Sequence, residues 1–218
     1  MVDVLYEDNH IIVAVKPRGV LSQADGSNKP DMLTILKDYI KEKYNKPGNV
    51  YLGLLHRLDI NTKGVMVFAR TSKAASRLSE DIQKHDFVKK YLATVEGIID
   101  NKDFILLESK ISKDEKIRKA YIDKNGQIAK LEYRCIKNYK IGNTNVSDLD
   151  IILHTGRFHQ IRCQMSSIGH PLYGDTKYGS KNKIDGDSFP LVAYHLEFKH
   201  PISKEIMKFE IWKWALWI

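Results

Sequence analysis

Apolar and polar residues alternate along much of this chain, which predicts that it is built mostly of strands. Residues 4–15 are expected to form a hairpin, because Asp8 and Asn9 provide turn chemistry between two β-branched stretches. Further strands are predicted at residues 65–69, 88–95, 104–107, 118–123, 127–136, 149–153, 192–198 and 206–212.

Three segments carry apolar residues at helical spacing instead. The first follows a cap at Asp31 and ends near Tyr44, and the second begins at Ser72. The third is expected over residues 157–168, closed by Gly169; its predicted buried stripe is Phe158, Ile161, Met165 and Ile168. Strands therefore outnumber helices by about three to one and often follow one another directly, which favours an α+β fold around a mixed, largely antiparallel sheet.

Composition narrows the class of protein. The chain has 218 residues, of which 43% are hydrophobic and 28% charged, and it shows no repeat or linker, so we expect one globular domain over residues 1–218. Lysine and arginine number 35 and aspartate and glutamate 27, so the net charge is 35 − 27 = +8. An excess of this size favours a polyanionic partner such as nucleic acid.

The cysteines and the apolar runs indicate the cellular setting. Cys135 and Cys163 form no CxxC pair, so we expect two buried free thiols in a reducing compartment. The N-terminus lacks the features of a signal peptide, and no apolar run approaches the ~20 residues of a membrane span. A soluble, cytoplasmic protein is therefore expected. The tail with Trp212, Trp214 and Trp217 is predicted to be a final strand packed on the core, rather than a patch for a partner or membrane.

Two polar segments could carry chemistry. The first places His56, Arg57 and Asp59, followed by Lys63, between two apolar stretches. Loops held by rigid neighbours often carry reactive groups. An ordinary turn, in which Asp59 acts as a cap or pairs with Arg57, accounts for these residues as well, and the segment alone leaves both readings open.

The second polar segment opens the third predicted helix. At 100° per residue, His159, Arg162 and Ser166 share a face turned away from the apolar stripe. Arg157 and the first helical N–H groups suit a phosphate, and Arg162 could hold a carboxylate through two hydrogen bonds. A solvated polar face is the alternative.

Motifs for metals and nucleotide cofactors are missing from the sequence. The histidines form no HExxH motif and have no cysteine pair beside them, so no metal site is predicted. The sequence also lacks a Walker A loop and a GxGxxG loop after a strand, so nucleotide cofactors are not expected. A GxSxG elbow, which would carry a nucleophilic serine, is absent too.

Four blocks of sequence follow one another along the chain: LYEDNHIIVAVKPRGVL (5–21), HRLDINTKGVMVFAR (56–70), KKYLATVEG (89–97) and LHTGRFHQIRCQMSSIGHPLYGDTKYG (153–179). Together they resemble the RluA-type pseudouridine synthases, which isomerise uridine within structured RNA. The resemblance runs from one end of the chain to the other. It implies the pseudouridine synthase fold, with a mixed sheet flanked by helices and a central RNA-binding cleft.

The resemblance also implies roles for individual residues. Asp59 matches the catalytic aspartate, Tyr91 the aromatic residue that stacks on the target uracil, and Arg162 the arginine paired with that aspartate. Arg57 matches the arginine that fills the gap left by the flipped base, and base flipping makes such a residue physically reasonable. Further RNA contacts are expected from His56, Lys63, Arg157 and His159.

The implied reaction is redox-neutral and hydrolyses nothing, so neither a metal nor another cofactor is expected, and a monomer is the default. The family often has Thr-Ser-Gly where this chain has Thr62-Lys63-Gly64, and Lys63 could add a phosphate contact. No S4 RNA-binding domain is expected, because the first block begins near Leu5. The sequence leaves ribosomal and transfer RNA open as substrates. The alternatives are a non-catalytic RNA-binding or ribosome-assembly factor and a metal-dependent nuclease.

Overall fold

A computed structural model describes residues 2–184 and 188–211. The chain divides into two compact units, the first formed by residues 1–87 with 193–211 and the second by residues 88–192. Each unit combines a largely antiparallel sheet with helices, so the predicted α+β class is confirmed. A single catalytic domain over residues 1–218 stays a prediction. Trp212, Trp214 and Trp217 lie outside the described residues.

The first unit orders its strands β1-β2-β4-β10, with β11 beside β10 and β3 beside β4. Their bounds are β1 Asp3–Glu7, β2 Ile11–Lys16, β3 Gly53–Leu54, β4 Lys63–Ala69, β10 Leu191–Lys199 and β11 Ile206–Glu210. The predicted hairpin at residues 4–15 is confirmed as β1 and β2. Strand β2 runs antiparallel to β4, and their register places Lys16 opposite Gly64.

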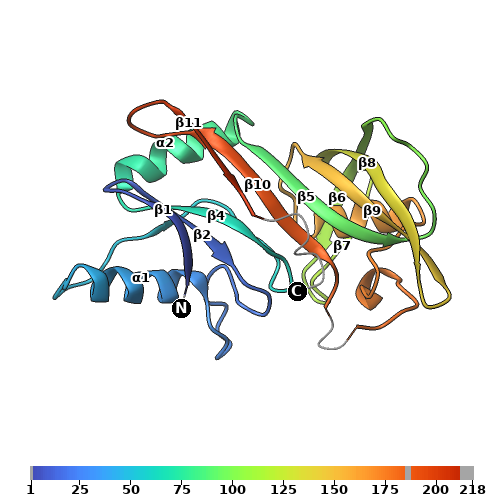
Figure 1. The fold of residues 1–218 in the computed structure, drawn as a ribbon, viewed down its shortest axis with the longest axis horizontal. Helices are drawn as coiled ribbons and strands as arrows, with labels where there is room; N and C mark the ends of the chain where they lie inside the picture. Colours follow the sequence, from blue (N-terminus) through green and yellow to red (C-terminus); the bar gives the residue numbers. More distant parts are fainter. Residues whose placement is uncertain (1, 185–187, 212–218) are drawn as a thin grey trace. The chain divides into compact units, whose positions relative to one another are not determined.

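Helices α1 (Met32–Lys43) and α2 (Ser72–Gln83) lie below and above strands β1, β2 and β4 in Figure 1. Both begin where the sequence predicts. Asp31 caps α1 by accepting the Thr34 N–H (3.1 Å), and Thr71 caps α2 by accepting the Ala74 N–H (3.1 Å). All six residues of β2 are buried, as central strands covered on both faces must be. The last residue of this covered strand is Lys16.

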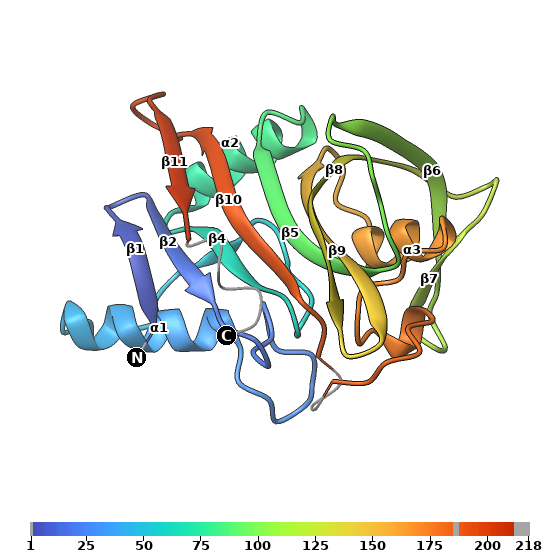
Figure 2. The same ribbon diagram turned by 45° about the vertical axis from the view of Figure 1, so that its right-hand side comes forward.

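The second unit orders its strands β5-β9-β8-β6-β7, each antiparallel to its neighbour. Their bounds are β5 Val88–Glu96, β6 Ile105–Asp114, β7 Lys119–Ile122, β8 Gln127–Ile141 and β9 Thr144–Leu153. Helix α3 (Gln160–Ser167) lies within the curve of β6 to β9 in Figure 2, and a 3₁₀ turn, η1, follows at Thr176–Tyr178. A small core joins α3 to the sheet through Cys163, Ile111 and Ala129.

The start of the third helix was predicted wrongly. The helix begins at Gln160 and not at residue 157, because His159 adopts a left-handed conformation (φ 49°). In addition, the Gln160 side-chain carbonyl accepts the Arg157 N–H (3.0 Å), which holds the preceding loop in place. Its ending is confirmed, since Gly169 follows the last turn with φ 85°.

The predicted stripe on this helix is only half right. Ile161 and Met165 are buried, but Phe158 precedes the helix and Ile168 is half-buried at its end. Gln160, Arg162 and Gln164 are buried as well. Polar residues therefore fill positions on this helix that the apolar pattern assigned to solvent. The two cysteines are buried and free, as predicted. Within the described residues, no helix is both long and apolar enough to cross a membrane.

Candidate active site

Asp59 lies on a tight turn between β3 and β4 in the first unit. Its carbonyl oxygen accepts the Thr62 N–H (3.0 Å), so residues 59–62 form a turn that leads directly into β4. Asp59 is half-buried, whereas Arg57 is exposed, so the turn holds a carboxylate near the surface with an arginine two residues before it. Lys63 is half-buried at the first position of β4.

Leu58, the residue before Asp59, is fixed by Ser22. The Ser22 hydroxyl donates to the Leu58 carbonyl oxygen (2.9 Å) and accepts from the Leu58 N–H (3.0 Å). Both residues are buried, so these backbone groups have no access to solvent water. The clamp fixes the position of the backbone from which the Asp59 side chain projects.

Lys16 supports the other side of the turn. Its side chain is fully buried at the end of β2, and its ammonium donates to the carbonyl oxygens of Ile60 (3.0 Å), Val20 (2.6 Å) and Pro17 (3.0 Å). Burial lowers the pKa of Lys16 to about 7, and the nearby Asp59 carboxylate opposes that shift. Lys16 thus places an amine close to Asp59 whose positive charge is lost as the pH rises through about 7.

His56 holds the start of this loop against β4. Its Nε2 accepts the Val67 N–H (3.2 Å), so this nitrogen carries no proton and the ring is neutral in this arrangement. The interaction gives His56 a structural part in the loop. An RNA contact through His56 stays a prediction.

Arg162 belongs to the second unit and is buried on α3. Its Nε and Nη2 donate to the two carboxylate oxygens of Asp175 (2.6 and 2.9 Å), which is a bidentate pair. The guanidinium also lies over the rings of Tyr178 (4.7 Å to the centroid) and Phe189 (4.5 Å). The sequence predicted a two-pronged carboxylate pair for Arg162, and Asp175 supplies that carboxylate within this unit. The pair of Arg162 with Asp59 stays a prediction.

The predicted polar face of α3 is confirmed, and Tyr178 covers it. His159 Nδ1 contacts the Tyr178 hydroxyl (2.9 Å), Arg162 lies over its ring, and Ser166 donates to its carbonyl oxygen (2.6 Å). The Tyr178 hydroxyl also accepts the Ala120 N–H (2.7 Å). The hydroxyl can donate its own proton to His159 Nδ1 while it accepts the Ala120 N–H, so one tyrosine oxygen joins the loop at His159 to β7.

His159 is surrounded by positive charge. Burial, followed by the charges of Arg162, Lys177, Arg118 and Lys113, lowers the pKa of His159 to about 3. The ring is therefore a neutral hydrogen-bond donor at physiological pH. A neutral imidazole adds a hydrogen bond and no charge to a phosphate contact.

Tyr91 and Arg157 occupy the remaining predicted positions of this unit. Tyr91 is 7% exposed on β5 and pairs in register with Ile151 of β9. Arg157 does not cap the helix, since α3 begins three residues later; its Nε instead donates to the Ile128 carbonyl oxygen (2.9 Å). The prediction that Arg157 opens the helix is therefore wrong, whereas a contact of Arg157 with RNA stays a prediction.

Sequence reasoning missed Lys16, Ser22, Asp175 and Tyr178. A signal for Asp175 exists, because a buried arginine needs a carboxylate and Asp175 is the first acidic residue after Asp150. The signal for Lys16 is a lysine that ends the apolar run IIVAV. In residues 2–184 and 188–211, no three His, Cys, Asp or Glu side chains gather in a way that could hold a metal ion.

Comparison with known proteins shows which family the chain belongs to. Residues 10–167 match the family described as RNA pseudouridylate synthase. The chain is 35% identical over 220 residues to an uncharacterized RNA pseudouridine synthase of Aquifex aeolicus, covering 96% of this chain and 69% of that protein. It is 33% identical over 224 residues to the ribosomal large subunit pseudouridine synthase D of Pseudomonas aeruginosa, covering 95% and 67%. The chain belongs to the RNA pseudouridylate synthase family.

A solved structure supports the fold of this synthase. The human RNA pseudouridylate synthase domain containing 1 superposes with a TM-score of 0.76 at 21% identity, covering 97% of this chain and 83% of that one. The resemblance drawn from the four sequence blocks is thus confirmed, and the protein is an isomerase that acts on RNA. This finding argues against a non-catalytic RNA-binding factor and against a nuclease.

The Ser22 clamp predicts a loss of stability when its hydroxyl is removed. Replacing Ser22 with alanine leaves two buried backbone groups of Leu58 without partners, so the free energy of unfolding should fall by about 1–3 kcal/mol. Urea unfolding measures the change. Ser27→Ala is the control, because it removes an exposed hydroxyl that donates to the nearby Asp25, and it should change stability by less than about 0.5 kcal/mol. Equal stability of the two variants would show that Ser22 does not hold the turn.

The environment of His159 predicts how its ring titrates. The unfolded chain binds this proton near pH 6.5, and the folded protein only near pH 3, so protonation favours unfolding. The contribution of His159 to stability should therefore decline as the pH falls from about 6.5 towards 3. In an NMR titration assigned with His159→Gln, the folded ring should not titrate between about pH 8 and 5, whereas the urea-denatured protein should. A midpoint near 6.5 in the folded protein would contradict the assigned environment.

Proposed function

We propose that Asp59 is the reacting carboxylate of this synthase and that the substrate is a uridine in ribosomal RNA. The observation that carries the proposal is the construction of the Asp59 turn, clamped by Ser22 on one side and by Lys16 on the other. Rigid placement of a charged group is what a chemical step requires of its scaffold. Ribosomal RNA is favoured because relatives such as the Pseudomonas aeruginosa protein are named as ribosomal large subunit synthases.

The reaction balances without a cofactor. The bond between C1′ of the ribose and N1 of uracil breaks, the uracil turns, and a new bond forms between C1′ and C5. The hydrogen on C5 passes to solvent, and N1 gains a proton. Asp59 can either add to C1′ or remove the C2′ proton, and both routes need the ionised carboxylate. The positive charge of Lys16 nearby favours that form.

The other proposed roles follow the family resemblance. Tyr91 stacks on the target uracil, and Arg162 pairs with the reacting carboxylate. Arg57 enters the space that the flipped base leaves in the RNA. Arg57 is exposed, as an arginine that enters RNA must be. His56, Lys63, Arg157 and His159 complete the proposed RNA contacts.

The synthase is proposed to act as a monomer in the cytoplasm, without a metal or other cofactor. Its net charge of +8 supplies affinity for the phosphate backbone. RNA binding should therefore weaken steeply as salt is added.

Asp59→Asn tests the central role. Removing the reacting charge at nearly constant shape should lower turnover by roughly 10⁴-fold or more while RNA binding is kept. Tritium release from C5-labelled uridine, in ribosomal RNA from cells that lack the gene, measures turnover with and without EDTA. Asp38→Asn is the control, since Asp38 is exposed on α1. Full turnover by Asp59→Asn, or loss of turnover on adding EDTA, would contradict the proposal.

Two substitutions at Tyr91 separate stacking from hydrogen bonding. Base stacking on an aromatic ring contributes about 1–3 kcal/mol, so Tyr91→Ala should lower kcat/KM by about 5- to 150-fold. Tyr91→Phe keeps the ring and should have a much smaller effect. Thermal unfolding of both variants checks the packing of this buried position, which is 7% exposed. Equal losses of activity would instead assign the role to the hydroxyl.

A further inference from the structure

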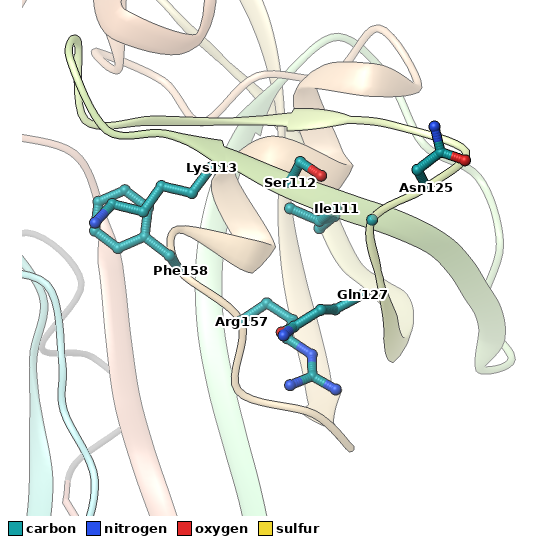
Figure 3. A pocket seen from close by; sticks show the side chains of 8 residues that line it. Ile111, Ser112, Lys113, Asn125, Gln127, Arg157 and Phe158 are labelled. Atoms are coloured by element: carbon teal, nitrogen blue, oxygen red, sulfur yellow. The ribbon is translucent and has the colours of Figure 1, made fainter.

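A cavity of about 340 Å³ lies in the second unit, and Arg157 is the one proposed site residue among those that line it. Its walls come from the end of β6, from the turn between β7 and β8, and from the loop before α3 (Figure 3). The polar and aromatic groups in these walls are Ser112, Lys113, Asn125, Gln127, Arg157 and Phe158. We call this cavity the β6–β8 pocket. Its volume falls at the lower end of the range for small-ligand sites, about 300–1,000 Å³.

Contacts within the chain hold the walls of the pocket in place without a ligand. Asp123 accepts the Ser112 hydroxyl (2.6 Å) and the Asn125 N–H (3.0 Å), which ties the β7–β8 turn to β6. Gly126 lies so close to β6 that an added Cβ would stand 2.5 Å from the Ile111 carbonyl carbon, so only glycine fits there. Arg157 is held by its bond to the Ile128 carbonyl oxygen (2.9 Å). A ligand would therefore meet a preformed site, which limits the entropic cost of binding.

The lining residues suit a ligand that carries both a negatively charged group and a polar ring, because cations, neutral polar side chains and an aromatic ring lie together in the walls. Lys113 places its ammonium 4.7 Å from the centroid of the Phe158 ring, and Arg157 and Gln127 extend together on the other side of the pocket in Figure 3. Among the described residues that line it, none is acidic. Lys113 forms an ion pair with Glu115 (2.5 Å), and that glutamate is largely exposed.

Positive charge continues beyond the pocket. Residues 110–130 contain seven lysines and arginines and three acidic residues. Lys119 lies over the Tyr178 ring (5.2 Å), and Lys177 donates to the Ile117 carbonyl oxygen (2.9 Å). Burial lowers the pKa of Lys177, and the positive charges of Arg162 and Arg118 lower it further. These cations therefore lie close enough to repel one another. A polyanion is the partner that relieves such repulsion.

The pocket is also connected to Arg162 within the same unit. The Phe158 ring stacks on His159 (3.8 Å between centroids), His159 bonds to the Tyr178 hydroxyl, and Tyr178 lies beneath Arg162. Three contacts therefore lead from the wall of the pocket to a residue of the proposed active site.

We propose that the β6–β8 pocket binds one nucleotide of the RNA substrate other than the uridine that is modified. Lys113 and Arg157 contact its phosphate, and Gln127 and Asn125 contact its ribose or base. The inference rests on the proposed function, because it assumes that RNA is the substrate. A contact of this kind is the same before and during the chemical step, so it should change KM and leave kcat unchanged.

Lys113→Gln tests the phosphate contact, with Lys84→Gln as its matched control. Each lysine is paired with a glutamate, Lys113 with Glu115 at 2.5 Å and Lys84 with Glu80 at 2.6 Å, and each substitution removes one positive charge. Binding to ribosomal RNA from cells lacking the gene is measured over a series of salt concentrations. Lys113→Gln should weaken binding and raise KM by about 3- to 10-fold, and should reduce the slope of log Kd against log salt by about 1. Lys84→Gln should leave that slope unchanged.

Gln127→Leu tests the contact to ribose or base without changing charge. Gln127 is exposed, so the variant should fold normally, which thermal unfolding checks. KM should rise by about 3-fold or more with the salt slope kept, because one or more neutral hydrogen bonds are lost. Wild-type behaviour of Gln127→Leu, with the expected effect of Lys113→Gln, would reduce the site to a phosphate contact and overturn the binding of a whole nucleotide.

The outcomes separate this inference from the proposed function. If the wild-type protein releases tritium and Lys113→Gln behaves as Lys84→Gln does, the pocket does not bind RNA, while the proposed function stands. If the wild-type protein releases no tritium but Lys113→Gln and Gln127→Leu weaken RNA binding as expected, the proposed function fails and the pocket stands.

Discussion

The proposed catalytic turn depends on one buried lysine. Lys16 ends a strand in which every residue is buried, and its ammonium is completely removed from solvent. Burying an ammonium costs several kcal/mol unless hydrogen bonds replace its water. Here three carbonyl oxygens do so, and they belong to the loop after β2 and to the turn that follows Asp59. The charge can be buried only when both loops are in place, so their conformations are coupled, and with them the position of Asp59.

The second unit uses the same physical solution around Arg162. This arginine is 7% exposed and pairs with Asp175, and two aromatic rings cover its guanidinium. Gln164 of α3 is another buried polar side chain that forms hydrogen bonds within the protein. Its amide donates to the carbonyl oxygens of Leu107 (3.1 Å) and Ala129 (3.2 Å). A helix of eight residues is too short to be stable through its own propensity. Buried polar contacts with β6 and β8 therefore fix it, and they fix Arg162 with it.

The parts of the fold that local chemistry determines could be predicted from the sequence. The hairpin at residues 4–15 and the starts of α1 and α2 were correct, because turn residues and caps act within a few positions. The helix at residue 160 begins late because of the left-handed His159 and the Gln160 side chain, and neither has a strong local signature. Lys16 and Asp175 were missed because their partners are distant in the sequence, 44 residues away for Ile60 and 13 for Arg162.

Mapping pseudouridine in cellular RNA tests the central claim most directly. Ribosomal RNA from a strain lacking the gene is compared with RNA from the same strain carrying either the wild-type protein or Asp59→Asn. We expect one or a few uridines to remain unmodified in the deletion strain, and only the wild-type protein to restore pseudouridine at those positions. Restoration by Asp59→Asn would contradict the assignment of Asp59. An unchanged pattern of pseudouridine in ribosomal RNA after deletion would contradict the proposed substrate.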